Sequence, residues 1–407
     1  MRRLEAGRLS LHPVFIAMGE GGAVMPSSSP IGHAASAQVP QERWTAEQVS
    51  AIRAGRYDAA PVIRSEDIIP IAPDLDIWDA WPIQDADGLP SDVGSGRSLW
   101  MALGAPRFPD PEERHAHARI QLLERSARGW KHLGPVMPDG FSPGSREWSG
   151  SAVMAPDRAS LTLYFTATGR RGEASPTFEQ RLFQAEARLS TVTGAFRLED
   201  WRGLREIVQS DPAHYMASDA GSGAVGTIKA FRDPAYFRDP IDGSHRIFFA
   251  GSHAGSRSAF NGVVGSAIAL DDTLDRWEIL PPMLSADTLN NELERPHVVF
   301  HQAHYYLFWS TQAHVFNPAG PIGPTGLYGM VSDRLSGGWM PLNGTGLVLA
   351  NPAAAPRQAY SWLVLPDLQV TSFVDAWGAD APAGRFGATF APMLQLRLDG
   401  ATAGLAG

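Results

Sequence analysis

The feature of this 407-residue chain that most restricts its fold is a series of short apolar or alternating runs separated by Gly, Pro, Asp and Asn. Runs of this kind, bounded by turn residues, are typical of β-strands. The clearest of them are 98–104, 161–166, 245–250, 296–301, 304–309, 362–365 and 368–374. Roughly fifteen to twenty short strands with few long amphipathic segments between them favour a β-propeller or a large sandwich over βαβ units. The fold class is therefore expected to be all-β.

Two stretches predict hairpins, and one predicts a helix. Residues 296–309 (PHVVFHQAHYYLFW) and 360–374 (YSWLVLPDLQVTSFV) each contain two strand patterns joined by a short turn. Residues 43–54 (RWTAEQVSAIRA) predict the clearest helix, with Thr45 as N-cap and an apolar stripe. A weaker amphipathic pattern at 201–209 predicts a second short helix. We expect 1–42, rich in Gly, Ala, Ser and Pro, to be disordered, and 43–407 to be one domain.

Composition excludes several classes of function. The net charge of −9, without a basic stripe, argues against a nucleic-acid partner. The chain has no cysteine, so disulfides, thiolate zinc sites and cysteine nucleophiles are excluded. No apolar run reaches the roughly 18–20 residues of a membrane span, and His12 and Pro13 interrupt a short N-terminal run, which does not predict a clear signal peptide. Nothing in the sequence indicates an obligate protein partner.

One short stretch, 74–88 (DLDIWDAWPIQDADG), raises a question about chemistry because Asp79 stands between Trp78 and Trp81. Indole faces and carboxylates together suit a sugar site, where a ring covers the C–H side of the sugar and acids hold its hydroxyls. The alternatives are that Asp79 caps a turn or helix before Pro82 and that the indoles are core residues. The surrounding acids are most simply loop residues, with a smaller prospect of cation binding: Asp74, Asp76, Asp85 and Asp87.

Three further stretches place acids or a Trp–Ser pair at predicted strand ends: 147–150 (EWSG), 231–234 (FRDP) and 292–296 (ELERP). The innermost strands of propeller blades converge on one axis, so acids far apart in sequence can meet in one funnel. Two meeting carboxylates can break a glycosidic bond, one as nucleophile and the other as acid. An Arg stands directly beside two of these acids, in Arg232-Asp233 and Glu294-Arg295, which fits a site tuned by nearby charge. The alternative is that these pairs are surface salt bridges.

The order WDAWP, EWSGSA, FRDP, ELERPHVVF, QAYS, FAP resembles glycoside hydrolase family 68, which contains levansucrases, inulosucrases and bacterial β-fructofuranosidases. The resemblance runs from Trp44 to the FAPML segment at 390–394. It implies a five-bladed β-propeller with a central acidic active-site pocket and a short N-terminal helix, with 43–407 as a single catalytic domain. It also implies no cofactor and a secreted or periplasmic location.

The resemblance assigns a role to each matching residue. Asp79 matches the nucleophile, Asp233 the acid that stabilises the transition state, and Glu294 the general acid/base. The residues that match the substrate-binding positions are Trp78, Trp148, Ser149 and Arg232 on the fructosyl side, and Glu292 and Tyr360 on the glucosyl side. The second Arg-Asp-Pro, at 238–240, matches a hairpin turn.

The implied reaction is that of a retaining fructosyltransferase, which cleaves sucrose and transfers fructose to a sugar acceptor or to water. The alternatives are a β-fructofuranosidase that mainly hydrolyses sucrose or a related fructoside, and a propeller that binds fructan without cleaving it. The last of these would be expected to lack one of the three acids, and all three are present. Linkage and product length depend on acceptor geometry and do not follow from these motifs.

Some positions depart from the family pattern near the acceptor. Ala235 replaces the usual His after Arg-Asp-Pro, and residues 249–252 read Phe-Ala-Gly-Ser, without the acid that many members carry. Gln312 stands where many levansucrases have Arg or His, with His314 as a rival for that position. Because Gln312 lacks the charged, bidentate grip of Arg, we expect altered acceptor handling.

The calcium-binding acids of Gram-positive members find no match in this sequence. Asn291 precedes Glu292, and Thr227 occupies the position six residues before Asp233. We therefore expect no metal site.

Overall fold

The computed structural model describes residues 42–53, 57–192, 194–217, 228–378 and 385–406. Pro40–Gly407 form one compact unit. The expected disorder concerns 1–42, of which 1–41 lie outside the described residues, as does Thr227. For Glu42 the expectation is wrong, because this residue begins strand β1(Glu42–Arg43).

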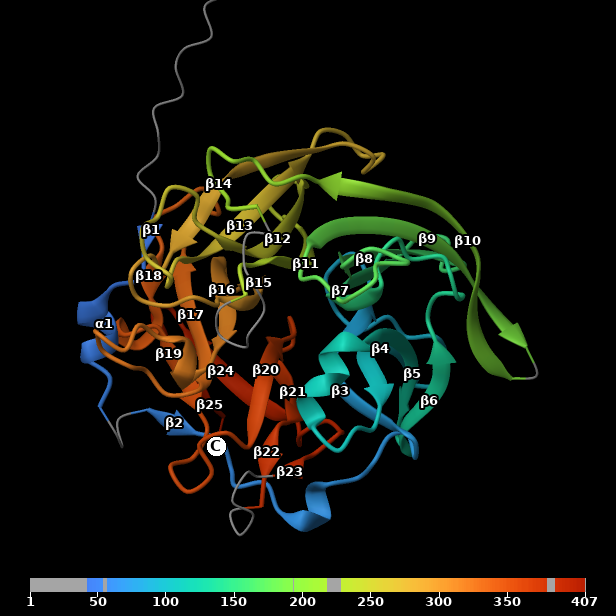
Figure 1. Ribbon diagram of the computed structural model, residues 1–407, viewed down its shortest axis with the longest axis horizontal. Coiled ribbons are helices and arrows are strands. Elements are labelled where there is room, and N and C mark those ends of the chain that lie inside the picture. Colours follow the sequence, from blue (N-terminus) through green and yellow to red (C-terminus); the bar gives the residue numbers. More distant parts are fainter. Residues whose placement is uncertain (1–41, 54–56, 193, 218–227, 379–384, 407) are drawn as a thin grey trace, which may run out of the picture. The chain divides into compact units, whose positions relative to one another are not determined.

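The described part of the chain folds into five four-stranded blades, which follow one another in sequence around a central axis (Figure 1). The first two blades are β3(Leu75–Gln84), β4(Ser98–Pro106), β5(Arg119–Ser126) and β6(Gly129–Pro135), then β7(Arg146–Met154), β8(Ser160–Thr168), β9(Gln180–Val192) and β10(Ala195–Val208). The third is β11(Phe231–Arg238), β12(His245–Ser252), β13(Gly262–Ala269) and β14(Trp277–Ser285). The fourth is β15(Glu294–His301), β16(His304–Thr311), β17(Gly326–Ser332) and β19(Leu347–Ala350), and the fifth is β20(Ala359–Val364), β21(Gln369–Val374), β24(Leu394–Asp399) and β25(Thr402–Leu405). The prediction of an all-β, five-bladed propeller is confirmed.

Short additional strands extend the blades. β1(Glu42–Arg43) and β2(Asp58–Ala59) pair in parallel with β14 and β19, so the start of the described chain covers the outer edges of two blades. β18(Met340–Pro341) pairs with β17, and β22(Ala376–Trp377) with β23(Arg385–Phe386). Four 3₁₀ turns connect strands: η1(Ser65–Asp67), η2(Pro111–Ala116), η3(Ala313–Val315) and η4(Leu342–Gly344).

The N-terminal helix is present but shorter than predicted. α1 covers Ala46–Ser50, and Thr45 caps it by accepting from the Gln48 N–H, while the Gln48 side chain accepts from the Thr45 N–H. Trp44 and Val49 are buried, as the apolar stripe predicts. Within the described residues, no helix is long and apolar enough to cross a membrane.

The helix predicted at 201–209 is wrong, because these residues belong to β10, the outermost strand of the second blade. The register of β10 against β9 shifts three times, between Glu199 and Arg202, between Arg202 and Arg205, and between Glu206 and Val208. Such shifts break the two-residue alternation of a strand, and the resulting spacing of charges imitates a helical face. Arg202 pairs with Glu186 of β9 at 2.9 Å, as cross-strand neighbours do.

Both predicted hairpins are confirmed. β15 and β16 are joined by Gln302 and Ala303 alone, whose φ values of 48° and 62° suit the tight turn that matches the twist of paired strands. β20 and β21 pair in the same antiparallel manner. These two hairpins supply the inner strands of the last two blades.

Candidate active site

The innermost strands of all five blades, β3, β7, β11, β15 and β20, share one irregularity. Each carries one extra residue relative to the next strand of its blade, so that the register shifts at a single point. The residues at these bulges are Asp79, Ser149, Asp233, Arg295 and Ser361. The residues directly before them are Trp78, Trp148, Arg232, Glu294 and Tyr360. The propeller thus repeats a two-residue unit five times around its axis.

A backbone bulge re-aims the side chains beside it, and here it directs them into one cavity. All ten residues of the repeated unit line a cavity of about 1140 Å³. At four of the bulges φ is positive: Asp79 (48°), Asp233 (64°), Arg295 (48°) and Ser361 (61°). At the fifth, Gly150 follows Ser149, and a Cβ on this glycine would overlap the Tyr164 carbonyl oxygen of the neighbouring strand.

The structure brings together every residue that the sequence singled out for the site. Ten predicted residues line this cavity: Trp78, Asp79, Trp148, Ser149, Arg232, Asp233, Glu292, Glu294, Gln312 and Tyr360. They come from the five innermost strands and from the segments on either side of the β15–β16 hairpin.

Asp79 is held by its neighbour in the second blade. The Ser149 hydroxyl donates to Oδ2 of Asp79 at 2.8 Å. Asp79 lies inside β3 and caps no helix, so that alternative is wrong. Trp78 is 2% exposed and Trp148 is 8% exposed. Both indoles pack in the core and also line the cavity, so they fit both the core and the site interpretation.

Glu294 accepts from two donors that lie in different blades. Arg232 donates from Nη2 to Oε1 at 2.6 Å, and the Tyr360 hydroxyl donates to Oε2. Burial, and next the nearby Glu294 carboxylate, raise the pKa of Tyr360 well above its usual value, so that the phenol keeps its proton. The Arg232 side chain is 6% exposed, which excludes the surface salt bridge proposed as an alternative.

Arg232 serves three carboxylates at once. Besides Glu294, its guanidinium lies 3.7 Å from Asp233 and 3.8 Å from Glu292. Burial opposes the charged form of Arg232, but the three acids outweigh this and raise its pKa. Burial raises the pKa of Asp233 to about 7 and the pKa of Glu292 to about 8, and the neighbouring Glu294 carboxylate adds to both shifts. The Arg232 charge only partly offsets this effect at Asp233 and Glu292.

Arg295 forms no ion pair with Glu294 in the described part of the chain, although the two residues are adjacent in sequence. Its guanidinium donates to Oγ of Ser361 at 2.9 Å and to the Ala80 carbonyl at 2.7 Å. Its backbone N–H donates to Oδ2 of Asp233 at 3.2 Å. Because the bulge turns Arg295 away from its neighbour, this residue joins four blades beneath the acids.

The outer aspartates divide into two groups. Asp76 is buried in β3 and pairs with Arg107 at 3.3 Å, so its prediction as a loop residue is wrong. Asp85 accepts from the Asp87 and Leu89 N–H groups, as a turn residue does. Asp239, in the second Arg-Asp-Pro, also begins a hairpin turn, where its carboxylate accepts from the Ile241 N–H.

Sequence motifs did not reveal every residue around the cavity. His115 of η2 contacts Trp78 edge-on, and its carbonyl accepts from the Trp148 indole at 3.4 Å. Burial, reinforced by Arg114, lowers the pKa of His115 to about 4, while burial raises the pKa of Asp375 to about 6. These residues lie in loops between strands, where no periodic pattern marks them, although the bulge residue Ser361 follows Tyr360 in the same two-residue unit as the known motifs.

On the acceptor side, both Gln312 and His314 line the cavity at η3. Desolvation lowers the pKa of His314, and the Glu294 carboxylate raises it. Burial is the larger effect, so the neutral imidazole of His314 is favoured in the cavity that also contains Glu294.

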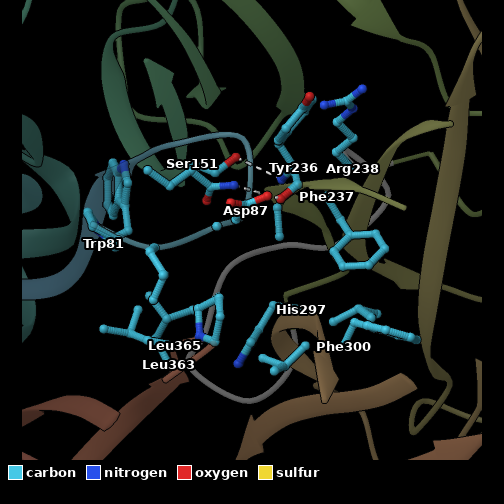
Figure 2. A pocket seen from close by; sticks show the side chains of 18 of the residues that line it. Trp81, Asp87, Ser151, Tyr236, Phe237, Arg238, His297, Phe300, Leu363 and Leu365 are labelled. Carbon is cyan, nitrogen blue, oxygen red and sulfur yellow. Dashed lines mark hydrogen bonds between the residues drawn. The ribbon is translucent and has the colours of Figure 1, made fainter. Parts of the chain in front are cut away.

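A second cavity, of about 530 Å³, is lined by the residues that follow the bulges in the same inner strands (Figure 2). Ala235 lines this second cavity and not the acidic one. His297, which also lines the second cavity, forms hydrogen bonds at both ring nitrogens, with the Arg295 carbonyl and with the Val364 N–H. Trp81 is 2% exposed and belongs to the core, so for this indole the alternative of a core residue holds.

Within the ranges that the structure describes, no three His, Asp or Glu side chains form a group suited to a metal ion.

Comparisons with known proteins agree with this geometry. A family model described as Levansucrase/Invertase matches residues 33–263 and 258–405. The chain is 33% identical to levansucrase LscA of Pseudomonas savastanoi pv. glycinea over 365 residues, covering 80% of this chain and 84% of that protein. It is 31% identical to the levansucrase of Rahnella aquatilis over 398 residues, covering 88% and 92%.

Solved structures show the same fold. The inulosucrase from Halalkalicoccus jeotgali bound to kestose superposes with a TM-score of 0.81 at 35% identity, covering 90% of this chain and 95% of that one. The levansucrase from Gluconacetobacter diazotrophicus superposes with a TM-score of 0.77 at 26% identity, covering 90% of each chain.

Proposed function

This chain belongs to glycoside hydrolase family 68, the levansucrases and invertases, and we propose that it cleaves sucrose and transfers the fructosyl group with retention of configuration. One observation carries the assignment of roles: a carboxylate held by a hydroxyl and a carboxyl group held by Arg and Tyr line the same cavity. Retaining glycosidases need such a pair, since one acid must attack while the other donates a proton.

In the first step, Asp79 attacks the anomeric carbon of fructose while the bond from that carbon to the glucosyl oxygen breaks. Glu294 gives its proton to this oxygen, and glucose leaves. The product is a fructosyl ester of Asp79. The Ser149 hydrogen bond at 2.8 Å orients the attacking carboxylate, which suits a near-attack geometry.

In the second step, Glu294 takes a proton from water or from a sugar hydroxyl, whose oxygen then attacks the anomeric carbon and releases Asp79. Positive charge develops on the fructosyl ring in both transition states, and the buried Asp233 stabilises it. Fructosyl hydroxyls that donate to Asp233 favour its ionised form, opposing the effect of burial on its pKa.

The walls of the cavity fit a furanose ring. Trp78 and Trp148 supply apolar surfaces, and Nη1 of Arg232 is a buried donor for which the described residues provide no acceptor. A fructosyl hydroxyl would satisfy this donor, which otherwise carries a desolvation cost. Glu292 and Tyr360 border the side on which glucose leaves.

Sucrose and sugar acceptors are accordingly the proposed partners, and we expect the protein to act outside the cytoplasm, as secreted or periplasmic members of its family do. Hydrolysis by the same residues is the second candidate, because water and a sugar hydroxyl compete for one fructosyl-enzyme. The levansucrase and inulosucrase relatives favour transfer.

Incubation of the purified protein with sucrose tests the proposal. Glucose released in excess of free fructose, together with fructose-containing oligosaccharides, is the expected result. Equal amounts of glucose and fructose would assign it to the hydrolases, and absence of glucose release would refute both. The Asp79→Asn variant serves as the background measurement.

A further inference from the structure

Lys229 lies outside the cavity and makes a set of contacts that neither the proposed mechanism nor the sequence motifs use. Its ammonium donates to the Ala259 carbonyl at 2.6 Å, to Oδ1 of Asn261 at 2.8 Å and to Oδ1 of Asn291 at 2.7 Å. A lysine ammonium has three N–H donors, and here each has an oxygen acceptor. These acceptors lie before β13 and before β15, so the ammonium joins three chain segments that are far apart in sequence.

The segment that carries Lys229 is itself fixed. Nε2 of Gln180 donates to the Lys229 carbonyl at 2.9 Å, and Oε1 of Gln180 accepts from the Phe231 N–H at 3.1 Å. Arg232 follows directly after Phe231, so Lys229 is anchored only three residues before the guanidinium that serves the acids. Asn261 and Asn291 are both fully buried.

Asn291 connects this ammonium to the site. Its Oδ1 accepts from Lys229, which leaves its Nδ2 directed at the Ile228 carbonyl at 3.4 Å and at Oε1 of Glu292 at 3.5 Å. The Lys229 ammonium and the Ile228 carbonyl therefore favour the same orientation of the Asn291 amide, with Nδ2 towards Glu292. Oε1 of Glu292 lies 3.8 Å from Nη2 of Arg232, the same nitrogen that donates to Glu294.

The charges of Lys229 and Glu292 also favour this arrangement. Burial raises the pKa of Glu292, and the positive charge of Lys229 counteracts part of this rise. In turn, burial lowers the pKa of Lys229 while Glu292 raises it. The two groups thus stabilise one another's ionised forms across Asn291.

We propose that Lys229 is a positioning residue for the reaction: its ammonium orients Asn291, and through it Glu292, so that Arg232 remains directed at Glu294. This inference rests on the proposed function, since it takes Glu294 as the acid/base. Without the ammonium, the side-chain oxygens of Asn261 and Asn291 and the Ala259 carbonyl lose this donor. The hold on the Asn291 amide then weakens, and so does the position of Glu292 relative to Arg232.

The test compares Lys229→Met, which keeps the length of the side chain but removes the charge, with Lys229→Arg, which keeps the charge. Lys131→Met is the matched control, since Lys131 is exposed on β6, away from the cavity. For each protein, kcat and KM on sucrose, the pH–rate profile and Tm are measured. The titration of Glu292 is followed by carbon NMR of the side-chain carboxyl.

We expect Lys229→Met to lower kcat about tenfold with less than about a threefold change in KM, because the loss concerns groups that act in the transition state. The Glu292 titration and the alkaline limb of the pH–rate profile move to higher pH. Lys229→Arg retains the wild-type titration, and Lys131→Met behaves as wild type throughout.

Two results would overturn the proposal: a Lys229→Met variant with wild-type kcat, or equal losses in both Lys229 variants with an unmoved Glu292 titration. The second result would make Lys229 a purely structural cross-link. The NMR titration needs no turnover of sucrose, so it tests the inference even if the wild-type protein fails to cleave sucrose and the proposed function falls.

Discussion

Asp79 and Asp233 occupy equivalent positions in two blades that are not adjacent, each at the bulge of an innermost strand with positive φ, 48° and 64°. Their surroundings differ: Asp79 is half-buried and accepts from the Ser149 hydroxyl, whereas Asp233 is buried and accepts from the Arg295 N–H. One backbone device thus presents two carboxylates with different access to the cavity. The more accessible one suits attack, and the buried one suits stabilisation of positive charge.

The bulge conformation determines which variant tests the nucleophile. Asn tolerates positive φ as Asp does, whereas Ala at such a position costs roughly 1 kcal/mol of strain. We expect Asp79→Asn to lower kcat on sucrose by at least about 10³-fold with little change in Tm, because the attacking oxygen is lost but the turn is kept. Initial rates of glucose release and thermal unfolding measure the two quantities.

Asp200→Asn is the control for this variant, since Asp200 also has positive φ, 54°, but lies exposed on β10. It should retain full activity. Residual sucrose cleavage near the wild-type rate in Asp79→Asn would remove Asp79 from the mechanism.

The Tyr360 hydroxyl is the second donor to Glu294, so Tyr360→Phe isolates its contribution. Hydrogen bonds to charged groups contribute about 1.5–3 kcal/mol, which corresponds to a decrease in kcat of roughly ten- to a hundredfold. KM for sucrose should change less, because Arg232 continues to hold Glu294. Steady-state kinetics on sucrose measure both constants.

Tyr215→Phe is the matched control, since Tyr215 is also fully buried and its hydroxyl donates to a backbone carbonyl, that of Leu280, at 2.6 Å. Its loss should lower Tm but leave kcat unchanged. Equal effects of both variants on kcat would show that Tyr360 acts through stability alone.

The raised pKa values of Asp233 and Glu292 predict how stability depends on pH. Both groups bind protons in the folded state at pH values where the unfolded chain releases them, near pH 4. Their contribution to stability is therefore complete below about pH 4 and is lost as pH rises through about 7 for Asp233 and about 8 for Glu292.

Accordingly, Tm of the wild-type protein should decrease as the pH is raised from about 5 to about 8.5. The Tm of Asp233→Asn should decrease less over this interval, because Asn carries no charge to bury. Differential scanning calorimetry across this range measures the two slopes. Parallel slopes in the two proteins would mean that Asp233 is ionised throughout.

The sequence predicted the strands because they are short, apolar and bounded by turn residues, and these signals are local. The pattern left a propeller and a sandwich open, and the five blades followed from the resemblance to a family. The site residues followed from the resemblance that the order of the motifs carries, and the structure shows that these motifs lie at the bulges of the inner strands. The β10 strand was mistaken for a helix because register shifts, which depend on the partner strand, altered its spacing of charges. Local patterns contain no information on such shifts.

The sequence also could not predict which residues of different blades form hydrogen bonds with one another. Arg295 stands next to Glu294 but binds Ser361 and the Ala80 carbonyl, because the bulge determines its direction. Likewise, His115 and Asp375 reach the cavity from loops whose paths depend on the packed propeller. The sequence also could not decide whether Gln312 or His314 faces the acceptor, since both line the cavity from one 3₁₀ turn.

The position of His314 in the cavity that also contains Glu294 predicts which of these two residues handles the acceptor. A neutral imidazole in the cavity of the general base can orient an incoming sugar hydroxyl, whereas Gln312 caps η3 without a side-chain bond to its backbone. We expect His314→Ala to lower the ratio of transfer to hydrolysis at least about threefold, and Gln312→Ala to change it less. Chromatography of the products from sucrose gives this ratio as oligosaccharide relative to free fructose. A larger effect of Gln312→Ala would assign the acceptor position to Gln312 instead, in keeping with its place in the sequence alignment to the family.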